Sequence, residues 1–338
     1  MTQADRSILH PTHSVSIVIP VYQGARTLPA VIAEIAALTG EITSPDGHTF
    51  RVVETLLVDD NGPDNSAATI RSLAAEYDFV RAVWLSKNFG QHAATLAGMA
   101  SSGGDWVVTL DEDGQHDPAD IGAMLDVAMR EQSSIVYIKP TNPAPHGFLR
   151  NAASKGAKWT LNKMFSGSNA QDFQSFRLIL GSTARSVAAY AGSGVYLDVA
   201  ISWVAGRAST CPLALRDEGE RRSGYSTRRL FSHYWRMVLS SGTRGLRVVS
   251  VIGAAFAAIG LGFALYILIA RLAGQVDAEG WASTIVVQLL GSGAILFSLG
   301  MIAEYIGVNV NMAMGKPAYL ITSDPANGPL GRRPNVLD

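Results

Sequence analysis

The chain has 338 residues, with 27 Lys and Arg against 28 Asp and Glu, for a net charge of −1. This length suits a globular domain with an added segment, and the near-neutral balance excludes a general nucleic-acid binder, so no nucleic-acid partner is expected. Cys211 is the only cysteine, which excludes an intramolecular disulfide and any metal site with two cysteine ligands.

The first part of the chain alternates apolar runs with segments of helical periodicity. Residues 1–14 are polar, and we expect no signal peptide there. The apolar runs predict strands at 15–19, 54–58, 80–85, 106–110 and 134–138. The periodic segments predict helices at 27–38, 65–77, 92–101 and 121–131. Strands that alternate with helices predict an α/β domain with a parallel, helix-flanked sheet.

Polar clusters follow four of these strands at the point where each strand ends. They are Pro20-Val21-Tyr22, Asp59-Asp60, Ser86-Lys87-Asn88 and Asp111-Glu112-Asp113. In helix-flanked parallel sheets, ligands bind beyond the carboxyl ends of the strands. Because the four clusters converge on one edge of the sheet, they predict a single binding site.

The acidic cluster after residues 106–110 predicts a site for a metal ion and a diphosphate. Side chains alternate along an extended strand, so Asp111 and Asp113 fall on the same side of the backbone. Two hard oxygen ligands, with Gln115 two residues further on, suit Mg²⁺ or Mn²⁺ carrying a diphosphate. The alternative is a solvated acidic turn after a buried strand.

The middle of the chain carries two segments rich in cations. Residues 148–165 predict a helix that carries Arg150 and three lysines, and an ordinary solvated helix face would show the same pattern. Residues 227–244 mix arginines with aromatic and aliphatic side chains. That mixture is typical of an amphipathic helix in the membrane interface, with a buried packing helix as the alternative.

Two long apolar stretches predict membrane-spanning helices. Residues 246–270 contain a single charge, Arg247, and residues 282–303 contain none. Each exceeds the roughly 20 residues that cross a hydrocarbon core of about 30 Å. A buried pair of helices in a soluble protein is the alternative. Arginines and lysines flank the outer ends of the pair, so the positive-inside rule places both termini in the cytoplasm.

The motifs together resemble the polyprenyl-phosphate glycosyltransferases of glycosyltransferase family 2. This family includes dolichyl-phosphate mannose synthase and bacterial enzymes that load glucose or other sugars onto undecaprenyl phosphate. The resemblance runs from about residue 15 to residue 320, nearly the whole chain. It rests on Val15-Ser-Ile-Val-Ile-Pro-Val-Tyr22, Val58-Asp-Asp60, Lys87-Asn-Phe-Gly-Gln-His92, Asp111-Glu-Asp-Gly-Gln115, Arg150 with Lys155, Asp172-Phe-Gln-Ser-Phe-Arg177, Arg221-Arg-Ser-Gly-Tyr-Ser226, Glu304-Tyr-Ile-Gly307 and Gly315-Lys-Pro-Ala-Tyr319.

The resemblance implies a GT-A fold, which is Rossmann-like with a mostly parallel sheet, followed by two transmembrane helices. It implies contacts to the nucleotide donor from Pro20, Val21, Tyr22, Asp59, Asp60, Lys87, Asp111, Glu112, Lys139 and Ser226. The metal and the diphosphate would be held by Asp111, Asp113 and Gln115. The expected catalytic residues are Asp172 beside the acceptor phosphate, and Arg150 and Arg221, whose guanidinium groups suit phosphate.

The same resemblance implies a reaction, partners and a location. A sugar would pass from a nucleotide diphospho-sugar, UDP-glucose as the first choice, to a polyprenyl phosphate in one inverting displacement that requires Mg²⁺ or Mn²⁺. The product would serve cell-envelope glycan assembly at the cytoplasmic face of the inner or plasma membrane. Membrane lipid is an expected partner, and the family suggests a homo-oligomer, a tetramer.

The expected organisation has four parts. They are a cytoplasmic GT-A domain at 1–226, a juxtamembrane amphipathic region at 227–245, a two-helix transmembrane hairpin at 246–307 and a cytoplasmic tail at 308–338. The chain departs from the family at Gln23-Gly24, where Asn-Glu is common. This departure removes a carboxylate near the nucleoside and leaves the identity of the base open.

Two other functions fit parts of the sequence. A processive polysaccharide synthase would share the nucleotide-binding domain, but it usually has more membrane spans and a Gln-x-x-Arg-Trp motif, which this chain lacks. A non-catalytic membrane scaffold that senses sugar nucleotides would not need Asp111, Asp113, Asp172 and Arg221.

Overall fold

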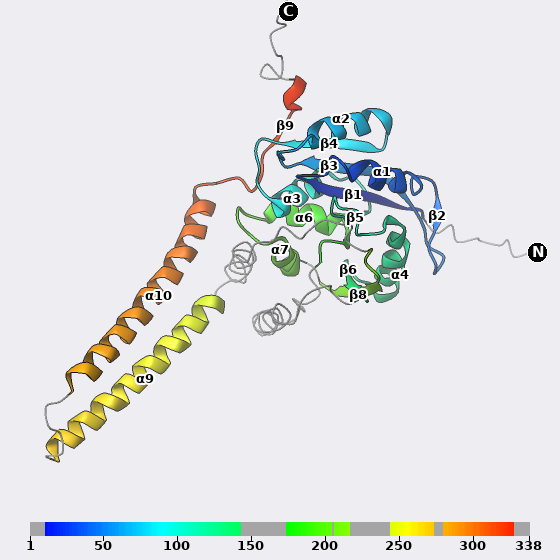
Figure 1. Cartoon of the computed structure of the whole chain (residues 1–338). Coiled ribbons are helices and arrows are strands. Elements are labelled where there is room, and N and C mark those ends of the chain that lie inside the picture. Colours follow the sequence, from blue (N-terminus) through cyan, green and yellow to red (C-terminus); the bar gives the residue numbers. More distant parts are fainter. Residues whose placement is uncertain (1–10, 143–173, 205, 217–243, 274–279, 328–338) are drawn as a thin grey trace, which may run out of the picture. The chain divides into compact units, whose positions relative to one another are not determined.

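The structure, a computed structural model, describes residues 11–142, 174–204, 206–216, 244–273 and 280–327 (Figure 1). The chain divides into two compact units. Unit 1 comprises Met1–Ser226 together with Pro317–Asp338, and unit 2 comprises Thr227–Lys316.

Unit 1 is built on one sheet, to which the described residues contribute nine strands in the order β8-β6-β7-β5-β1-β3-β4-β9, with β2 paired to β3. The strands are β1 (His13–Val21), β2 (Ile42–Thr43), β3 (Thr49–Asp59), β4 (Val80–Leu85), β5 (Trp106–Thr109), β6 (Ile135–Pro140), β7 (Arg177–Leu180), β8 (Ala208–Leu213) and β9 (Ile321–Thr322). The predicted strands are thus confirmed to within a few residues at most ends.

The sheet is mixed but mostly parallel, as predicted: six of its nine described strands run in one direction and three run against them. Parallel pairs join β1 to β3, β1 to β5, β3 to β4 and β6 to β8. Antiparallel pairs join β2 to β3, β4 to β9, β5 to β7 and β6 to β7. The three strands that run against the others have two to four residues each, too few to show a periodic pattern in the sequence.

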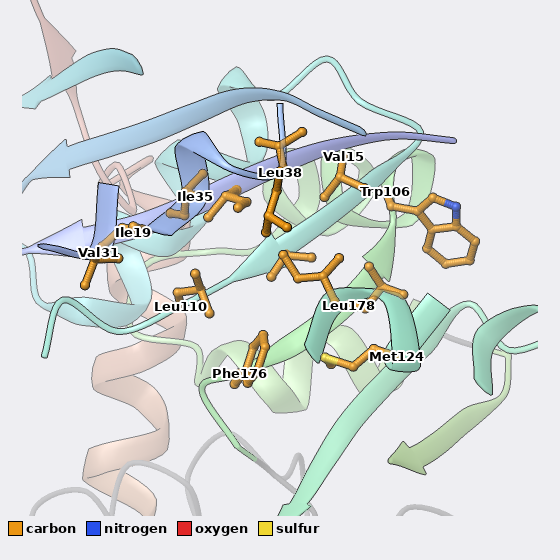
Figure 2. Packing of buried hydrophobic residues seen from close by; sticks show 14 of the residues in the cluster. Val15, Ile19, Val31, Ile35, Leu38, Trp106, Leu110, Met124, Phe176 and Leu178 are labelled. Atoms are coloured by element: carbon orange, nitrogen blue, oxygen red, sulfur yellow. The ribbon is translucent and has the colours of Figure 1, made fainter. Parts of the chain in front are cut away.

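Helices cover both faces of this sheet. They are α1 (Leu28–Ala36), α2 (Ser66–Glu76), α3 (Gln91–Ser101), α4 (Ile121–Glu131), α6 (Gly181–Tyr190) and α7 (Leu197–Val204). One buried cluster packs α1 and α4 against residues such as Val15, Ile19 and Leu178 (Figure 2). The other packs α3, α6 and α7 against Val18 and its neighbours. Strands buried on both faces form continuous apolar runs, as the sequence shows at 15–19.

Unit 2 contains two long helices that contact each other, α9 (Arg244–Leu272) and α10 (Trp281–Ala313). Both predicted spans are therefore helical. Large apolar side chains are exposed along them, including Ile259, Leu261, Tyr266, Leu296 and Phe297. Within the described residues, one stretch, Leu290–Ala313, is long and apolar enough to cross a membrane, and the apolar stretch of α9, Val249–Phe263, is shorter.

After α10 the chain returns to unit 1 as strand β9. This strand pairs with β4, with Thr322 opposite Trp84 and Ile321 opposite Leu85. Just beyond it, the Arg71 guanidinium on α2 binds both carboxylate oxygens of Asp324 at 2.7 and 2.8 Å. The last described residues of the chain therefore belong to the edge of the sheet beside β4.

Candidate functional site

The topology brings the four polar clusters to one edge of the sheet. Strands β5, β1, β3 and β4 lie next to each other and run parallel, so their carboxyl ends share that edge. The register places Val21 opposite Asp59. The residues predicted from the strand ends therefore gather where the sequence places them.

Glu112 connects the end of β5 to the loop after β1. Its carboxylate accepts hydrogen bonds from the backbone N–H of Tyr22 at 2.8 Å and from that of Gln23 at 3.0 Å. A Cβ on Gly24 would lie 2.8 Å from a Glu112 oxygen and 2.9 Å from Leu28 Cγ, so a larger residue at this position would displace these side chains. Glu112 thus fixes the backbone of the loop that follows β1.

Asp60 organises the loop that follows β4. Its two oxygens accept hydrogen bonds from the backbone N–H groups of Phe89 at 2.7 Å and Gly90 at 2.8 Å. Asp60 is 3% exposed, and burial raises its pKa even though these two N–H groups favour the charged form. The side chain of Lys87, in the same loop, is exposed and lies over the Phe89 ring at 5.1 Å. Asp60 therefore fixes the backbone that presents Lys87.

Asp59 is a second buried carboxylate at this edge. Burial raises its pKa, and the neighbouring Asp60 raises it further, while Arg71 acts in the opposite direction. The turn that follows packs tightly on β1, since a Cβ on Gly62 would lie 1.6 Å from the carbonyl oxygen of Tyr22. A substitution at Gly62 would consequently displace the end of β1.

Two side chains from distant parts of the sequence orient Asp111. Gln91, the first residue of α3, donates from Nε2 to one carboxylate oxygen at 2.6 Å. Ser175, two residues before β7, donates from Oγ to the other oxygen at 2.5 Å. Gln91 and Ser175 both lie in motifs that carry the family resemblance, but the sequence assigned neither a role, because neither lies near Asp111 along the chain.

The turn after Asp111 is closed by its own side chains. The Asp113 carboxylate accepts the backbone N–H of Gln115 at 3.1 Å, and the backbone N–H of Asp111 points to His116 Nδ1 at 3.4 Å. Arg216 holds this turn from outside, donating its backbone N–H to the Gln115 carbonyl at 3.0 Å. Its guanidinium also pairs with Asp117 at 2.8 Å.

The carboxylate oxygens at this edge suit a divalent cation that arrives with a diphosphate. Among the described residues, no group of three or more His, Cys, Asp and Glu side chains gathers to form a metal site. Asp111 and Asp113 are both partly exposed beyond the end of β5, and Asp113 lies in a turn, so the alternation expected of an extended strand does not extend over them. Mg²⁺ and similar ions are commonly held by one or two carboxylates, with substrate phosphates and water completing the shell. Two carboxylates at this edge fit that requirement.

Of the other predicted residues, one is described and four are not. Lys139 is exposed near the carboxyl end of β6, which runs in the same direction as β5 and is separated from it by β7. Four predicted residues, namely Arg150, Asp172, Arg221 and Ser226, lie outside the residues that the structure describes. Their roles stay predictions.

These features define the class of the protein. The mixed α/β sheet is a GT-A-like fold with acidic residues at the carboxyl edge of its parallel strands. The model of the family described as glycosyl transferase family 2 matches residues 16–190, more than half of the chain. The chain belongs to glycosyl transferase family 2.

Similar curated proteins extend the comparison beyond the family model. The undecaprenyl-phosphate 4-deoxy-4-formamido-L-arabinose transferase of Klebsiella pneumoniae (strain 342) is 28% identical, with 92% of this chain and 93% of the relative covered. The protein of the same name from Pseudomonas fluorescens (strain SBW25) is also 28% identical, over 97% of this chain and 94% of its own. Both matches include the region of α9 and α10.

Solved structures give weaker likenesses. Mannosyl-3-phosphoglycerate synthase from Rubrobacter xylanophilus has a TM-score of 0.48 at 14% identity, covering 80% of this chain and 78% of the other. Glucosyl-3-phosphoglycerate synthase from Mycobacterium tuberculosis has a TM-score of 0.48 at 16% identity, covering 69% and 80%. Because both scores lie below 0.5, neither likeness bears on the function of this chain.

Proposed function

We propose that the chain transfers one sugar from a nucleotide diphospho-sugar to a polyprenyl phosphate at a membrane surface. One observation carries the proposal: a family 2 domain with Asp111 and Asp113 at its ligand-binding edge is continuous with two helices that expose large apolar side chains. The names of relatives that match over at least nine tenths of the chain support a lipid phosphate as the acceptor.

The reaction follows from the charges of its reactants. A phosphate monoester has a second pKa of about 6, so the acceptor is largely a dianion at neutral pH and needs little deprotonation. One of its oxygens attacks the anomeric carbon, the new C–O bond forms, and the bond to the nucleoside diphosphate breaks with inversion. The positions of the two reactants therefore contribute more than a strong general base.

The chain's own residues prepare the donor side of this reaction. Asp111 and Asp113 would hold a divalent cation, which when bound neutralises the charge on the departing nucleoside diphosphate. Glu112 and Asp60 fix the loops after β1 and β4 through backbone N–H groups, so both loops meet the donor in a set conformation. On the acceptor side, we propose Asp172, Arg150 and Arg221 as the catalytic residues.

The two helices would hold the chain at the membrane that contains the acceptor. A polyprenyl chain stays in the bilayer, so transfer must occur at its surface, and the exposed apolar side chains of α9 and α10 suit hydrocarbon. We propose that both helices cross the membrane and that unit 1 lies on the cytoplasmic side. We also propose a homo-oligomer, with a tetramer as the first expectation.

Radiolabelled transfer tests the proposal. The purified full chain is incubated with undecaprenyl phosphate, Mn²⁺ or Mg²⁺, and a panel of labelled donors that includes UDP-glucose and the nucleotide-activated form of 4-deoxy-4-formamido-L-arabinose. We expect label from at least one donor in a chloroform-soluble product that mild acid releases. Asp113→Ala should abolish transfer while the chain stays folded, and Asp46→Asn, in an exposed ion pair with Arg130, should retain it.

The outcomes separate the candidate functions. Label in a polymer insoluble in chloroform would indicate a processive synthase. Donor binding without transfer to any acceptor would indicate a non-catalytic scaffold. Full transfer by Asp113→Ala would contradict the role assigned to that carboxylate.

A further inference from the structure

The Asp111 carboxylate is oriented without losing its capacity to bind a ligand. Gln91 donates to one of its oxygens and Ser175 to the other. Each carboxylate oxygen has two acceptor sites, so one site on each remains available after these hydrogen bonds form. Carboxylates that bind metals are commonly held in this way by neighbouring hydrogen bonds.

Strand pairing explains why Ser175 reaches Asp111. Because β7 runs antiparallel to β5, the start of β7 lies at the carboxyl end of β5, with Arg177 opposite Thr109. The Thr109 hydroxyl donates to the Ser175 carbonyl at 2.5 Å and accepts a hydrogen bond from Arg177 Nε at 3.0 Å. The backbone of Ser175 is thus fixed by a hydroxyl that Arg177 itself holds.

Arg177 is in turn held by a buried partner. Its Nη1 pairs with the Asp198 carboxylate, and both side chains are only 4% exposed. The Tyr137 hydroxyl also donates to Asp198, at 3.2 Å. A buried ion pair is poor at raising stability, because desolvation of two charges offsets their attraction, and apolar residues often serve as well. Here the ion pair fixes the orientation of the Arg177 guanidinium, whose Nε donates to Thr109.

Gln91, the other residue that donates a hydrogen bond to Asp111, lies on a segment that also contacts the start of α7. Asp198 lies in the first turn of α7, and Tyr196 immediately precedes that helix. The Tyr196 ring packs on the ring of His92 with centroids 4.2 Å apart, and His92 follows Gln91 on the first turn of α3. The start of α7 therefore contacts the neighbours of both hydrogen-bond donors to Asp111. Asp198 pairs with Arg177 on the side of Ser175, and Tyr196 packs on His92 on the side of Gln91.

We propose that Ser175, backed by the buried Arg177–Asp198 pair, is a positioning residue that holds the Asp111 carboxylate in the orientation that receives the donor's cation and diphosphate. The inference rests on the proposed function and deepens it. Ser175 itself touches Asp111 and not the reacting atoms, so its effect is on donor and cation binding.

A hydroxyl deletion with a matched rescue tests the proposal. We compare Ser175→Ala, Ser175→Thr and, as a control, Ser202→Ala, whose hydroxyl donates to the Val199 carbonyl in its own helix. The first readout is calorimetric binding, in the presence of Mn²⁺, of whichever of UDP, GDP or CDP binds the wild-type chain best. The second is the thermal unfolding midpoint, and the third is sugar transfer with separate kcat and KM.

We expect Ser175→Ala to weaken the Mn²⁺-dependent binding about 10-fold or more, as is typical for residues that orient metal ligands, with no change in the unfolding midpoint. The donor KM should rise by a similar factor. Ser175→Thr keeps the hydroxyl and should restore most of the affinity, and Ser202→Ala should match the wild type.

The possible failures are distinguishable. Wild-type affinity in Ser175→Ala, or an equal loss in Ser175→Thr, would overturn the positioning role while transfer by the wild-type chain upholds the proposed function. Equal losses in Ser175→Ala and Ser202→Ala would show general loss of packing and also overturn it. A wild-type chain that neither binds these nucleotides nor transfers sugar would overturn the proposed function and the inference with it.

Discussion

Glu54 and Asp60 are both buried carboxylates, but they serve opposite ends of the sheet. Asp60 follows β3 and fixes the loop after β4 at the candidate site. Glu54 lies in the middle of β3, level with the start of β4, and accepts hydrogen bonds from Ser16 at 2.7 Å and from the Gly103 N–H at 2.6 Å. It also pairs with Arg81. The first carboxylate belongs to the site, and the second holds strands together away from it.

The pKa values of these two carboxylates shift in opposite directions. Burial alone raises the pKa of Glu54, but the hydrogen bonds from Ser16 and Gly103 and the contact with Arg81 outweigh it and lower the pKa below its ordinary value of 4.5. The folded chain therefore gains stability from charged Glu54 above pH 4.5, and loses it as the pH falls through the lowered pKa. Asp60, with a raised pKa, contributes with the opposite sign.

Glu54→Gln tests the stabilising role of the Glu54 carboxylate and the lowered pKa that goes with it. The amide brings donors where the carboxylate accepted, so we expect the free energy of unfolding at pH 7 to fall by about 1–3 kcal/mol. Its decline below pH 4.5 should be shallower than in the wild type, because the titrating group is gone. Denaturant unfolding between pH 3.5 and 7, with Glu131→Gln on α4 as the control, measures both. Parallel curves for Glu54→Gln and the wild type would contradict the assignment.

The elements that the sequence predicts best are those whose own residues carry the pattern. The continuous β-branched run at 15–19 specifies β1, which is buried on both faces, and the apolar residues that recur at helical spacing in 121–131 specify α4. The convergence of Asp60 and Asp111 on one edge followed from the parallel order of strands. These inferences needed only local pattern and a general rule for the sheet.

The parts that sequence analysis could not predict depend on pairing between distant segments. Strand β7 lies between β5 and β6 and runs antiparallel to both, and this insertion brings Ser175 to Asp111. The predicted contact of Glu112 with the donor stays a prediction, but the hydrogen bonds that its oxygens accept from N–H groups about 90 positions earlier in the chain were not foreseen. No local pattern of residues specifies such partners.

Strand β9 gives a prediction at the scale of an element. Asp324 anchors the segment after β9 through a bidentate contact with Arg71, whose guanidinium also lies 4.8 Å from the Trp84 ring. We expect Asp324→Asn to lower the free energy of unfolding by about 0.5–1 kcal/mol, near the upper end for a partly exposed pair. Asp46→Asn removes a more exposed ion pair and should cost less. An effect no larger in Asp324→Asn than in Asp46→Asn, by denaturant unfolding, would show that the pair does not anchor β9.

At the scale of the whole molecule, the proposed topology has α9 and α10 crossing the membrane in opposite directions. Three single-cysteine variants in a Cys211→Ser background test this: Asp78→Cys in unit 1, Gly280→Cys between the helices and Ala326→Cys after β9. In intact cells we expect a membrane-impermeant thiol reagent to label only Gly280→Cys, with the other two labelled after permeabilisation. Labelling of Gly280→Cys and Asp78→Cys from the same side would show that α9 does not cross.

The central claim is that one sugar passes to the phosphate of a lipid. The mass of the lipid product tests it most directly, using the purified chain, undecaprenyl phosphate, a divalent cation and the donor that gives the most label. We expect the mass of undecaprenyl monophosphate plus one glycosyl residue, with no added phosphate. A product with several sugars, a product with a second phosphate, or unchanged undecaprenyl phosphate with every donor would contradict it.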